Sequence, residues 1–289
     1  MATSDFILTR NDCLDQAFRK IHVIRPGGSL ALEQIEQGAA ALNMILREEE
    51  LHGTGLEKQL WAMSESYLIL AADRFIYGAT DGLPKDMIEL TQVFYRNTSG
   101  DDSPVAIFSL EQHGAITDKN EKGDTREVQL KRNRDLSQQT LHIWPAPDSV
   151  GTTSEVIGSD GRSYRCVMGN TSTVADAPIS GPDYLLYWVS GGAASTAWAS
   201  GSSYTNGELL RLLYKRPLYD FDLPTDNPDM PAGWGRYLVY RLACDLAPEY
   251  NIQLDERTWL ERQWRAAREE VFPATRSNTT DIHNKTMFY

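Results

Sequence analysis

Histidine, cysteine and carboxylate side chains are the groups in this chain that could do chemistry, but their spacing forms no catalytic pattern. The five histidines show neither HExxH nor any other metal-ligand spacing. The sequence has no GxSxG elbow, P-loop or GxGxxG, and Gly191-Gly192 lacks the lysine that a phosphate cradle needs. Carboxylates are plentiful, so counting alone leaves a lytic carboxylate pair open. We therefore predict no catalytic residue, no metal, no cofactor and no enzyme activity.

Aromatic residues supply the other candidate chemistry. Residues 151–207 are rich in glycine, serine and threonine and carry several tyrosines and tryptophans. Such rings can stack on the apolar face of a sugar, yet a small β module also needs them to fill its core. Both interpretations stay open, with core and spacer the simpler one. The candidate glycan contacts are Tyr187, Trp188, Trp198 and Tyr204.

Composition narrows the class of protein. The formal net charge of −12 argues against tight nucleic-acid binding, which needs clustered lysine and arginine. Cys13, Cys166 and Cys244 are widely spaced, which predicts buried reduced thiols rather than disulfides or a zinc site. Apolar runs such as residues 67–72 are too short to cross a membrane, and the first residues do not look like a signal peptide. We therefore expect a protein that stays where it is made.

Apolar residues at helical spacing predict two helices near the N-terminus. The first begins near Asn11 and ends before residues 26–28, and the second begins near Ser29. Gly38 lies inside the second helix, where glycine often marks the close approach of another helix. Residues 48–50 are three glutamates at the helix end, unfavourable for the helix dipole. They predict a solvated end or, alternatively, a subunit contact with basic residues.

Strands and turns dominate the middle of the chain. Ser109 and Gln112 can form a capping box for a short helix. Arg216 precedes a proline, which favours extended backbone and makes residues 208–219 a predicted strand. The other predicted strands are residues 67–70, 105–108, 127–131 and 140–144, the last two as a hairpin.

The clearest helix lies within residues 227–251. Asp229 can cap its start, Pro231 suits the first turn and Pro248 ends it. The predicted buried stripe is Trp234, Leu238, Leu242 and Leu246, with Val239 and Ala243 beside it. A last helix is predicted at residues 256–271, before Pro273. Its predicted core-facing residues are Trp259, Ala266, Ala267 and Val271.

The order and wording of several motifs resemble the head-to-tail adaptor family of tailed bacteriophages, also called tail accessory factors. The motifs are QGAAALNMIL (residues 37–46), SLEQHGAITDKNEKG (109–123), IWPAPD (143–148), LYDFD (218–222) and MPAGWGRYLVYRLACDLAPEYN (230–251). The family usually has a proline just after the Lys-Gly pair, where this chain has Asp124 and Thr125. The resemblance covers most of the chain.

The resemblance implies an α+β fold in which N- and C-terminal parts form a helical bundle around a central β region with an inserted small β module. It implies a virion structural protein of the phage neck, made in the host cytoplasm, that docks as a ring of twelve on the portal ring after DNA packaging. Downstream tail or nozzle proteins would attach to it, and DNA would pass through the channel without specific binding. An acidic lumen that cannot grip phosphate would suit that passage. No membrane is expected as a partner.

The resemblance also implies that the end of the chain inserts into crevices of the portal. The expected docking residues are Ile282, Met287, Phe288 and Tyr289. The expected parts of the chain are residues 1–59 (helical), 60–150 (β region), 151–207 (inserted module), 208–272 (returning strand and helices) and 273–289 (docking tail). Two other functions stay open: a glycan-binding module for host attachment and a cell-wall lytic enzyme.

Overall fold

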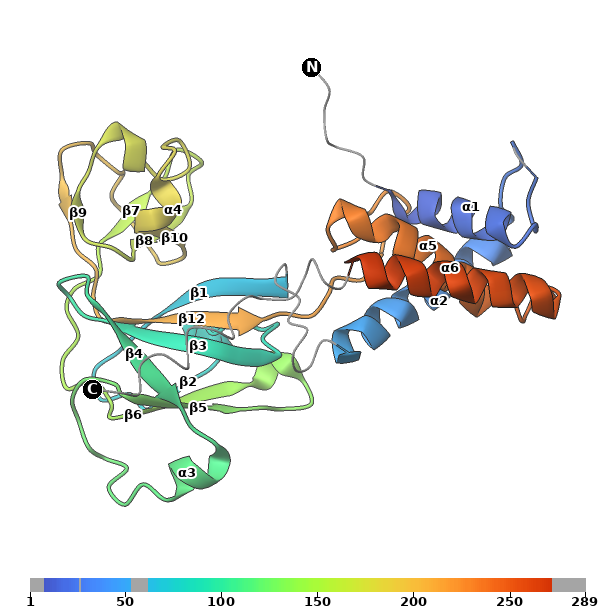
Figure 1. The fold of residues 1–289 in the computed structure, drawn as a ribbon. Coiled ribbons are helices and arrows are strands. Elements are labelled where there is room, and N and C mark those ends of the chain that lie inside the picture. Colours follow the sequence, from blue (N-terminus) through green and yellow to red (C-terminus); the bar gives the residue numbers. More distant parts are fainter. Residues whose placement is uncertain (1–7, 26, 53–61, 272–289) are drawn as a thin grey trace, which may run out of the picture. The chain divides into compact units, whose positions relative to one another are not determined.

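The computed structural model of the chain describes residues 8–25, 27–52 and 62–271 (Figure 1). The fold class is mixed α+β, as the sequence predicts. The chain divides into two compact units. We call residues 1–62 with 217–289 the helical unit, and residues 63–216 the sheet unit.

The helical unit draws its helices from both ends of the chain. They are α1 (Arg10–Lys20), α2 (Leu32–His52), the 3-10 turn η5 (Ala232–Trp234), α5 (Gly235–Leu246) and α6 (Leu254–Val271). The start of α1 is fixed by a capping box. The Thr9 hydroxyl accepts from the Asp12 N–H, and the Asp12 carboxylate accepts from the Thr9 N–H at 3.0 Å.

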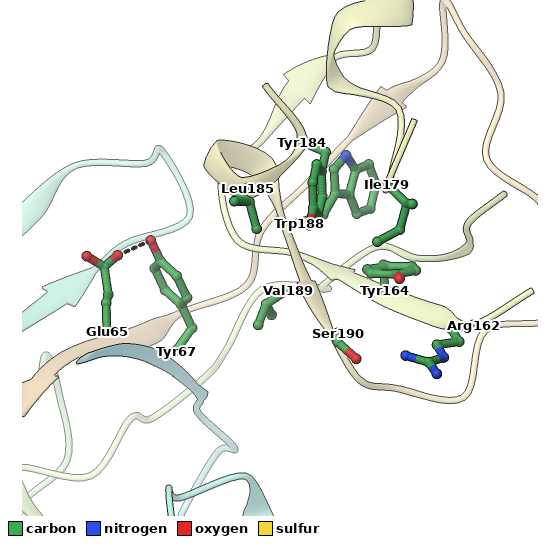
Figure 2. Close-up of a pocket in the computed structure, with 10 residues that line it drawn as sticks. All are labelled: Glu65, Tyr67, Arg162, Tyr164, Ile179, Tyr184, Leu185, Trp188, Val189 and Ser190. Carbon is green, nitrogen blue, oxygen red and sulfur yellow. Dashed lines mark hydrogen bonds between the residues drawn. The ribbon is translucent and has the colours of Figure 1, made fainter. Parts of the chain in front are cut away.

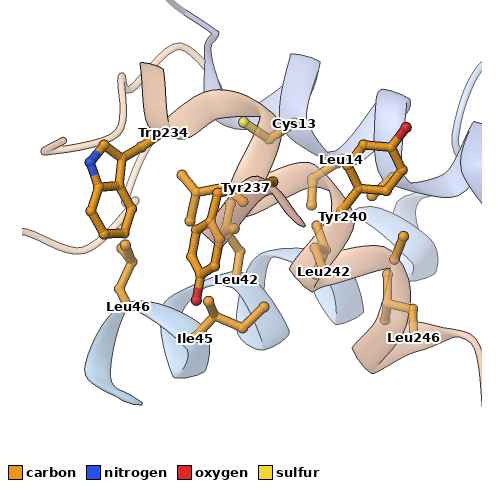
Figure 3. Close-up of a cluster of buried hydrophobic side chains, with 14 of the residues drawn as sticks. Cys13, Leu14, Leu42, Ile45, Leu46, Trp234, Tyr237, Tyr240, Leu242 and Leu246 are labelled. Atoms are coloured by element: carbon orange, nitrogen blue, oxygen red, sulfur yellow. The ribbon is translucent and has the colours of Figure 1, made fainter. Parts of the chain in front are cut away.

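Helix α5 packs against α1, α2 and α6 (Figure 1). Figure 3 shows Trp234, Tyr237 and Leu242 of its segment beside Leu42 and Leu46 of α2. The predicted stripe is confirmed, since all of its members are buried: Trp234, Leu238, Val239, Leu242, Ala243 and Leu246.

The predicted cap of this helix is wrong. Asp229 accepts a hydrogen bond from the Tyr219 N–H at 3.2 Å instead of capping the helix, because a 3-10 turn with Pro231 as its N-cap comes first. The helix ends at Leu246, two residues before Pro248, as predicted.

Gly38 is where α1 and α2 approach each other. A Cβ atom at this position would lie 2.8 Å from Cδ2 of Leu14 and 3.0 Å from Cε2 of Phe18. Both distances are shorter than an ordinary carbon contact, so only glycine fits without movement of α1. The predicted close approach is confirmed.

The predicted buried face of α6 is confirmed at Ala267 and Val271 and is wrong at Trp259 and Ala266. Trp259 and Ala266 are exposed, whereas Leu260 and Ala267 are buried. Trp264 and Val271 are partly buried against the same core. The positions of α6 that face the core are therefore 260, 264, 267 and 271. The first of them lies one position after the predicted Trp259.

The glutamates at the end of α2 have partners within the chain. Glu48 forms an ion pair with Arg241 of α5 at 2.7 Å, and Glu49 accepts from the buried Tyr237 hydroxyl. Glu50 pairs with Arg47 one turn earlier at 2.8 Å. They are therefore not a merely solvated helix end, and the alternative of a subunit contact stays a prediction.

The sheet unit is built on a seven-stranded sheet with the order β1-β12-β3-β4-β5-β6-β2. Only the β4–β5 pair is parallel in this sheet. Its strands are β1 (Met63–Ile69), β2 (Ile76–Tyr77), β3 (Glu89–Arg96), β4 (Asp102–Ile107), β5 (Glu127–Lys131), β6 (Thr140–Trp144) and β12 (Leu209–Lys215). The connections contain η2 (Ala79–Asp81), α3 (Leu110–Gly114) and η3 (Leu136–Gln138).

The sheet curls around its own core. Strands β1 and β2 form its two edges, yet only residues 70–75 connect them, a span of at most about 20 Å. Side chains alternate between the two faces of each strand. Tyr67 and its cross-strand partner Arg211 face away from the core, and the residues that face it include Leu68, Leu210, Leu212 and Val93. The opposite face carries both polar and apolar residues, and the candidate site lies there.

The remaining local predictions for this unit are confirmed. Ser109 and Gln112 form the capping box of α3. Strands β5 and β6 pair as an antiparallel hairpin, and β12 lies within the predicted strand at residues 208–219 but ends at Lys215. Where the adaptor family usually has proline, the Thr125 hydroxyl is buried and donates to the Pro145 carbonyl at 3.0 Å.

We call residues 151–207 the insert. Its elements are β7 (Glu155–Ile157), β8 (Ser163–Cys166), β9 (Asn170–Thr171), η4 (Val174–Asp176), α4 (Tyr184–Tyr187), β10 (Trp188–Ser190) and β11 (Ser203–Tyr204). They form a three-stranded sheet, β10-β8-β7, and a two-stranded sheet, β11-β9. The insert has a core of its own around Trp188, with Val156, Tyr164 and Cys166.

Candidate functional site

The rings predicted as glycan contacts lie in and around the core of the insert. Trp188 is buried, and its ring meets that of Tyr204 edge-on with centroids 5.0 Å apart. Tyr187, Trp198 and Tyr204 are partly buried against the same core. The Tyr204 hydroxyl also accepts from the Ala199 N–H at 2.9 Å. These rings hold the insert together, the simpler of the two sequence interpretations.

A buried arginine fixes the insert to the large sheet. Arg96, at the end of β3, donates through Nη1 to the carbonyl of Val167 at 2.9 Å. Its Nε and Nη2 reach the two carboxylate oxygens of Asp102 at 2.6 and 2.8 Å. Asn206 adds a second link, because its amide donates to the carbonyl of Asn97 at 2.8 Å.

The same face of the sheet carries a network of alternating charges. Arg211 of β12 donates to both carboxylate oxygens of Glu65 at 2.9 and 2.8 Å, and lies 3.6 Å from Asp102. The Tyr67 hydroxyl donates to Glu65 as well. Hydrogen bonds from Arg211 lower the pKa of Glu65, and those from Arg96 lower the pKa of Asp102. Burial raises the pKa of Tyr67 to about 12.

These lowered pKa values predict acid sensitivity. A carboxyl group whose folded pKa is lowered adds stability that is complete above its unfolded pKa, near 4, and is lost as the pH falls through the folded pKa. We therefore expect the melting temperature of the sheet unit to fall between about pH 5 and pH 2. The double variant Glu65→Gln, Asp102→Asn should show a shallower pH dependence in thermal scans. Glu111→Gln, at an exposed position, is the control and should keep the slope of the wild type.

A pocket of about 450 Å³ lies where the insert meets β1 (Figure 2). Glu65 and Tyr67 come from β1, and the other lining residues come from the insert. Those are Arg162, Tyr164, Ile179, Tyr184, Leu185, Trp188, Val189 and Ser190. Its size and mostly apolar lining, with a few polar groups, are typical of ligand sites.

Two polar groups of the pocket lining are held by hydrogen bonds to neighbouring residues. Glu65 is held by Arg211, and the Tyr164 hydroxyl donates to Asp160 at 2.8 Å. The described lining holds no histidine, cysteine or paired carboxylates that could act as nucleophile or as acid and base. Neither Tyr164 nor Tyr184 is among the predicted glycan contacts. The sequence does not reveal that these tyrosines line a pocket together with residues of β1, which lie about a hundred positions earlier in the chain.

Thiols and imidazoles elsewhere have structural surroundings. Burial raises the pKa of Cys13 to about 12 and that of Cys166 to about 11, which keeps both thiols protonated and unreactive. Cys244 is only partly buried, not buried as predicted. The rings of His113 and His142 meet edge-on at 5.6 Å, a pairing that sequence spacing could not reveal. Among the described residues, no three potential ligands gather to hold a metal ion.

The predicted portal-docking residues Ile282, Met287, Phe288 and Tyr289 lie outside the described residues. Within the described part of the chain, no helix combines the length and the apolar character needed to cross a membrane. In comparisons with known proteins, no family model matches the chain and no curated protein matches it.

Proposed function

We propose that this protein is a head-to-tail adaptor of a tailed bacteriophage, which docks as a ring on the portal and connects it to downstream tail components. The observation that carries the proposal is the position of α5. The segment whose wording most resembles the adaptor family forms the helix against which α1, α2 and α6 all pack. The resemblance therefore includes the helix that organises the helical unit.

Two other motifs of the resemblance contact each other. The Gly123 N–H donates to the Ala146 carbonyl at 2.9 Å, and the Ala146 N–H donates to the Glu121 carbonyl at 3.2 Å. One segment closes SLEQHGAITDKNEKG, and the other lies in IWPAPD. Motifs more than twenty residues apart that share backbone hydrogen bonds have a common structural role, which supports a resemblance based on their order and spacing.

In this proposal the helical unit is the family's helical bundle, built from the N- and C-terminal parts of the chain. The sheet unit is the central β region, and the insert is its added module. The protein is a structural component of the virion neck and not an enzyme. Twelve copies form the ring, and DNA passes through it without specific binding.

The experiment that tests the proposal is negative-stain electron microscopy of the protein mixed with portal rings of its phage. We expect an added density layer of the same rotational symmetry on one face of the portal. The protein without portal is the control for self-assembly. Portal rings that stay bare at micromolar protein would contradict the proposal, as would localisation of the protein to a distal fibre in the virion.

A further inference from the structure

The insert exposes large aliphatic side chains over a short stretch of sequence. Val174, Ile179, Leu185 and Leu186 are 74, 45, 67 and 59% exposed. Val174 lies in η4, Leu185 and Leu186 lie in α4, and Ile179 lies in the segment between them. The two elements contact each other, and the Asp183 N–H donates to the Ala175 carbonyl at 2.9 Å. Single exposed apolar residues are ordinary, but four of them on elements in mutual contact favour a contact surface. We call these four residues with the pocket the insert surface.

Ile179 adopts an unusual backbone conformation in this surface. Its φ angle is +69°, in the left-handed region that β-branched residues avoid. That geometry costs about 1–2 kcal/mol, and glycine or asparagine would relieve it. Hydrogen bonds on either side hold the turn, because the Gly181 N–H donates to the Ala177 carbonyl at 2.8 Å. The strained isoleucine lines the pocket and is close to half exposed, which points to use of its side chain.

The chemistry of the insert surface favours a protein over a saccharide. Sugars stack on open aromatic faces, but Trp188 and Tyr164 are buried in the core of the insert. The apolar side chains of this surface that are most open to solvent are aliphatic. Branched aliphatic groups pack well against apolar protein side chains and offer no π face to a sugar ring.

Arg162 adds a charge preference at the pocket. Its side chain is 78% exposed, and its Nε lies 3.8 Å from Asp160. That carboxylate already accepts from the Tyr164 hydroxyl at 2.8 Å and from the Arg162 N–H at 3.1 Å. The guanidinium therefore keeps most of its donors for a carboxylate from outside. If the insert surface bound a second copy of this chain, each Arg162 would face an Asp160 carboxylate that already accepts hydrogen bonds within its own chain.

We propose that the insert surface binds a segment of a different protein, which places an apolar side chain in the pocket and a neighbouring carboxylate on Arg162. The identity of this partner rests on the proposed function. In the proposed adaptor the C-terminal segment 273–289 binds the portal. The insert surface would therefore bind the downstream component of the phage tail.

The test is selection of peptides from a displayed random library on the full-length protein, followed by calorimetry with the selected peptides. We expect an aliphatic or aromatic residue within about four positions of Asp or Glu. Leu185→Asp should weaken binding at least tenfold, and Arg162→Glu should weaken acidic peptides at least fivefold. A lysine in place of the peptide's acidic residue should restore binding to R162E. Leu110→Asp, at another exposed leucine outside the insert, is the control.

Several results would overturn this proposal. One is peptide binding that L185D leaves unchanged. A second is self-association in sedimentation that L185D abolishes, which would make the partner a second copy. A third is binding of glucose or uronic-acid oligosaccharides that L185D abolishes. Portal docking should be normal in L185D, so failure here is distinguishable from failure of the adaptor function.

Discussion

A variant that lacks residues 277–289 is expected to fold normally and to lose portal docking, with an affinity at least a hundredfold lower. Folding should persist because α1, α2, α5 and α6, which supply the described core of the helical unit, all lie outside the deleted segment. Ordering a segment costs about 1–2 kcal/mol per residue, and burying each large apolar side chain returns about 1.5–3 kcal/mol. One tail therefore binds weakly, and a ring of linked tails binds strongly. Co-sedimentation with portal rings measures the loss.

Two matched variants separate apolar anchoring from mere length. Replacing Met287, Phe288 and Tyr289 by serine should reproduce the loss, because the apolar groups supply the favourable term. Replacing Asn278, Thr279 and Thr280 by serine should leave docking intact. Unimpaired docking of the truncated protein would show that the tail is dispensable.

The Arg96→Met variant is expected to lower the free energy of unfolding of the sheet unit by about 2–4 kcal/mol. Removing one partner of a buried ion pair leaves the other without compensation, which typically costs about 3–5 kcal/mol. Asp102 is partly exposed and stays near Arg211, so we expect a loss around or somewhat below the lower end of that range. The Val167 carbonyl also loses the donor that holds it. Denaturant unfolding measures the change in free energy.

The location of this loss shows whether Arg96 holds the insert on the sheet, a role that we call the Arg96 clamp, or stabilises the core of the sheet unit in general. Hydrogen exchange should speed up in the insert more than in the β5–β6 hairpin, because Arg96 bonds directly to the insert. Arg165→Met is the control within the insert. Its ion pair with Glu155 at 2.9 Å is partly exposed, and such pairs contribute below about 1 kcal/mol. Equal losses in R96M and R165M would argue against the clamp.

The insert surface and the Arg96 clamp address different questions about the same module. The clamp concerns how the insert is held on the sheet, and the exposed leucines concern what the insert binds. Because Leu185 makes no contact needed for the core of the insert, L185D should leave the acid dependence of the sheet unit unchanged. A change in both properties would mean that the insert surface is also structural.

Local sequence determined those elements whose stabilising contacts lie within a few residues. The stripe on α5, the capping box at Ser109 and the β5–β6 hairpin follow from spacing of three or four residues, or from alternation along a strand. Gly38 indicated a close approach without naming Leu14 and Phe18 as the side chains it meets. Trp259 was wrongly assigned because two neighbouring positions fit the same helical pattern almost equally well. Asp229 was wrongly assigned as a cap because a 3-10 turn precedes the helix.

Tertiary structure alone decided the partners of charged groups and the position of the pocket. Glu65 and Arg211 are 146 residues apart, and Arg96 reaches a carbonyl 71 residues later. No local pattern encodes such pairs, because their energy depends on strand order and on which face each side chain takes. The left-handed backbone conformation of Ile179 could not be predicted from the sequence either, because β-branched residues disfavour that conformation. Sequence therefore predicted the main helices and some of the strands, but not β3 or the individual strands of the insert. The candidate binding surface exists only where distant strands and the insert meet.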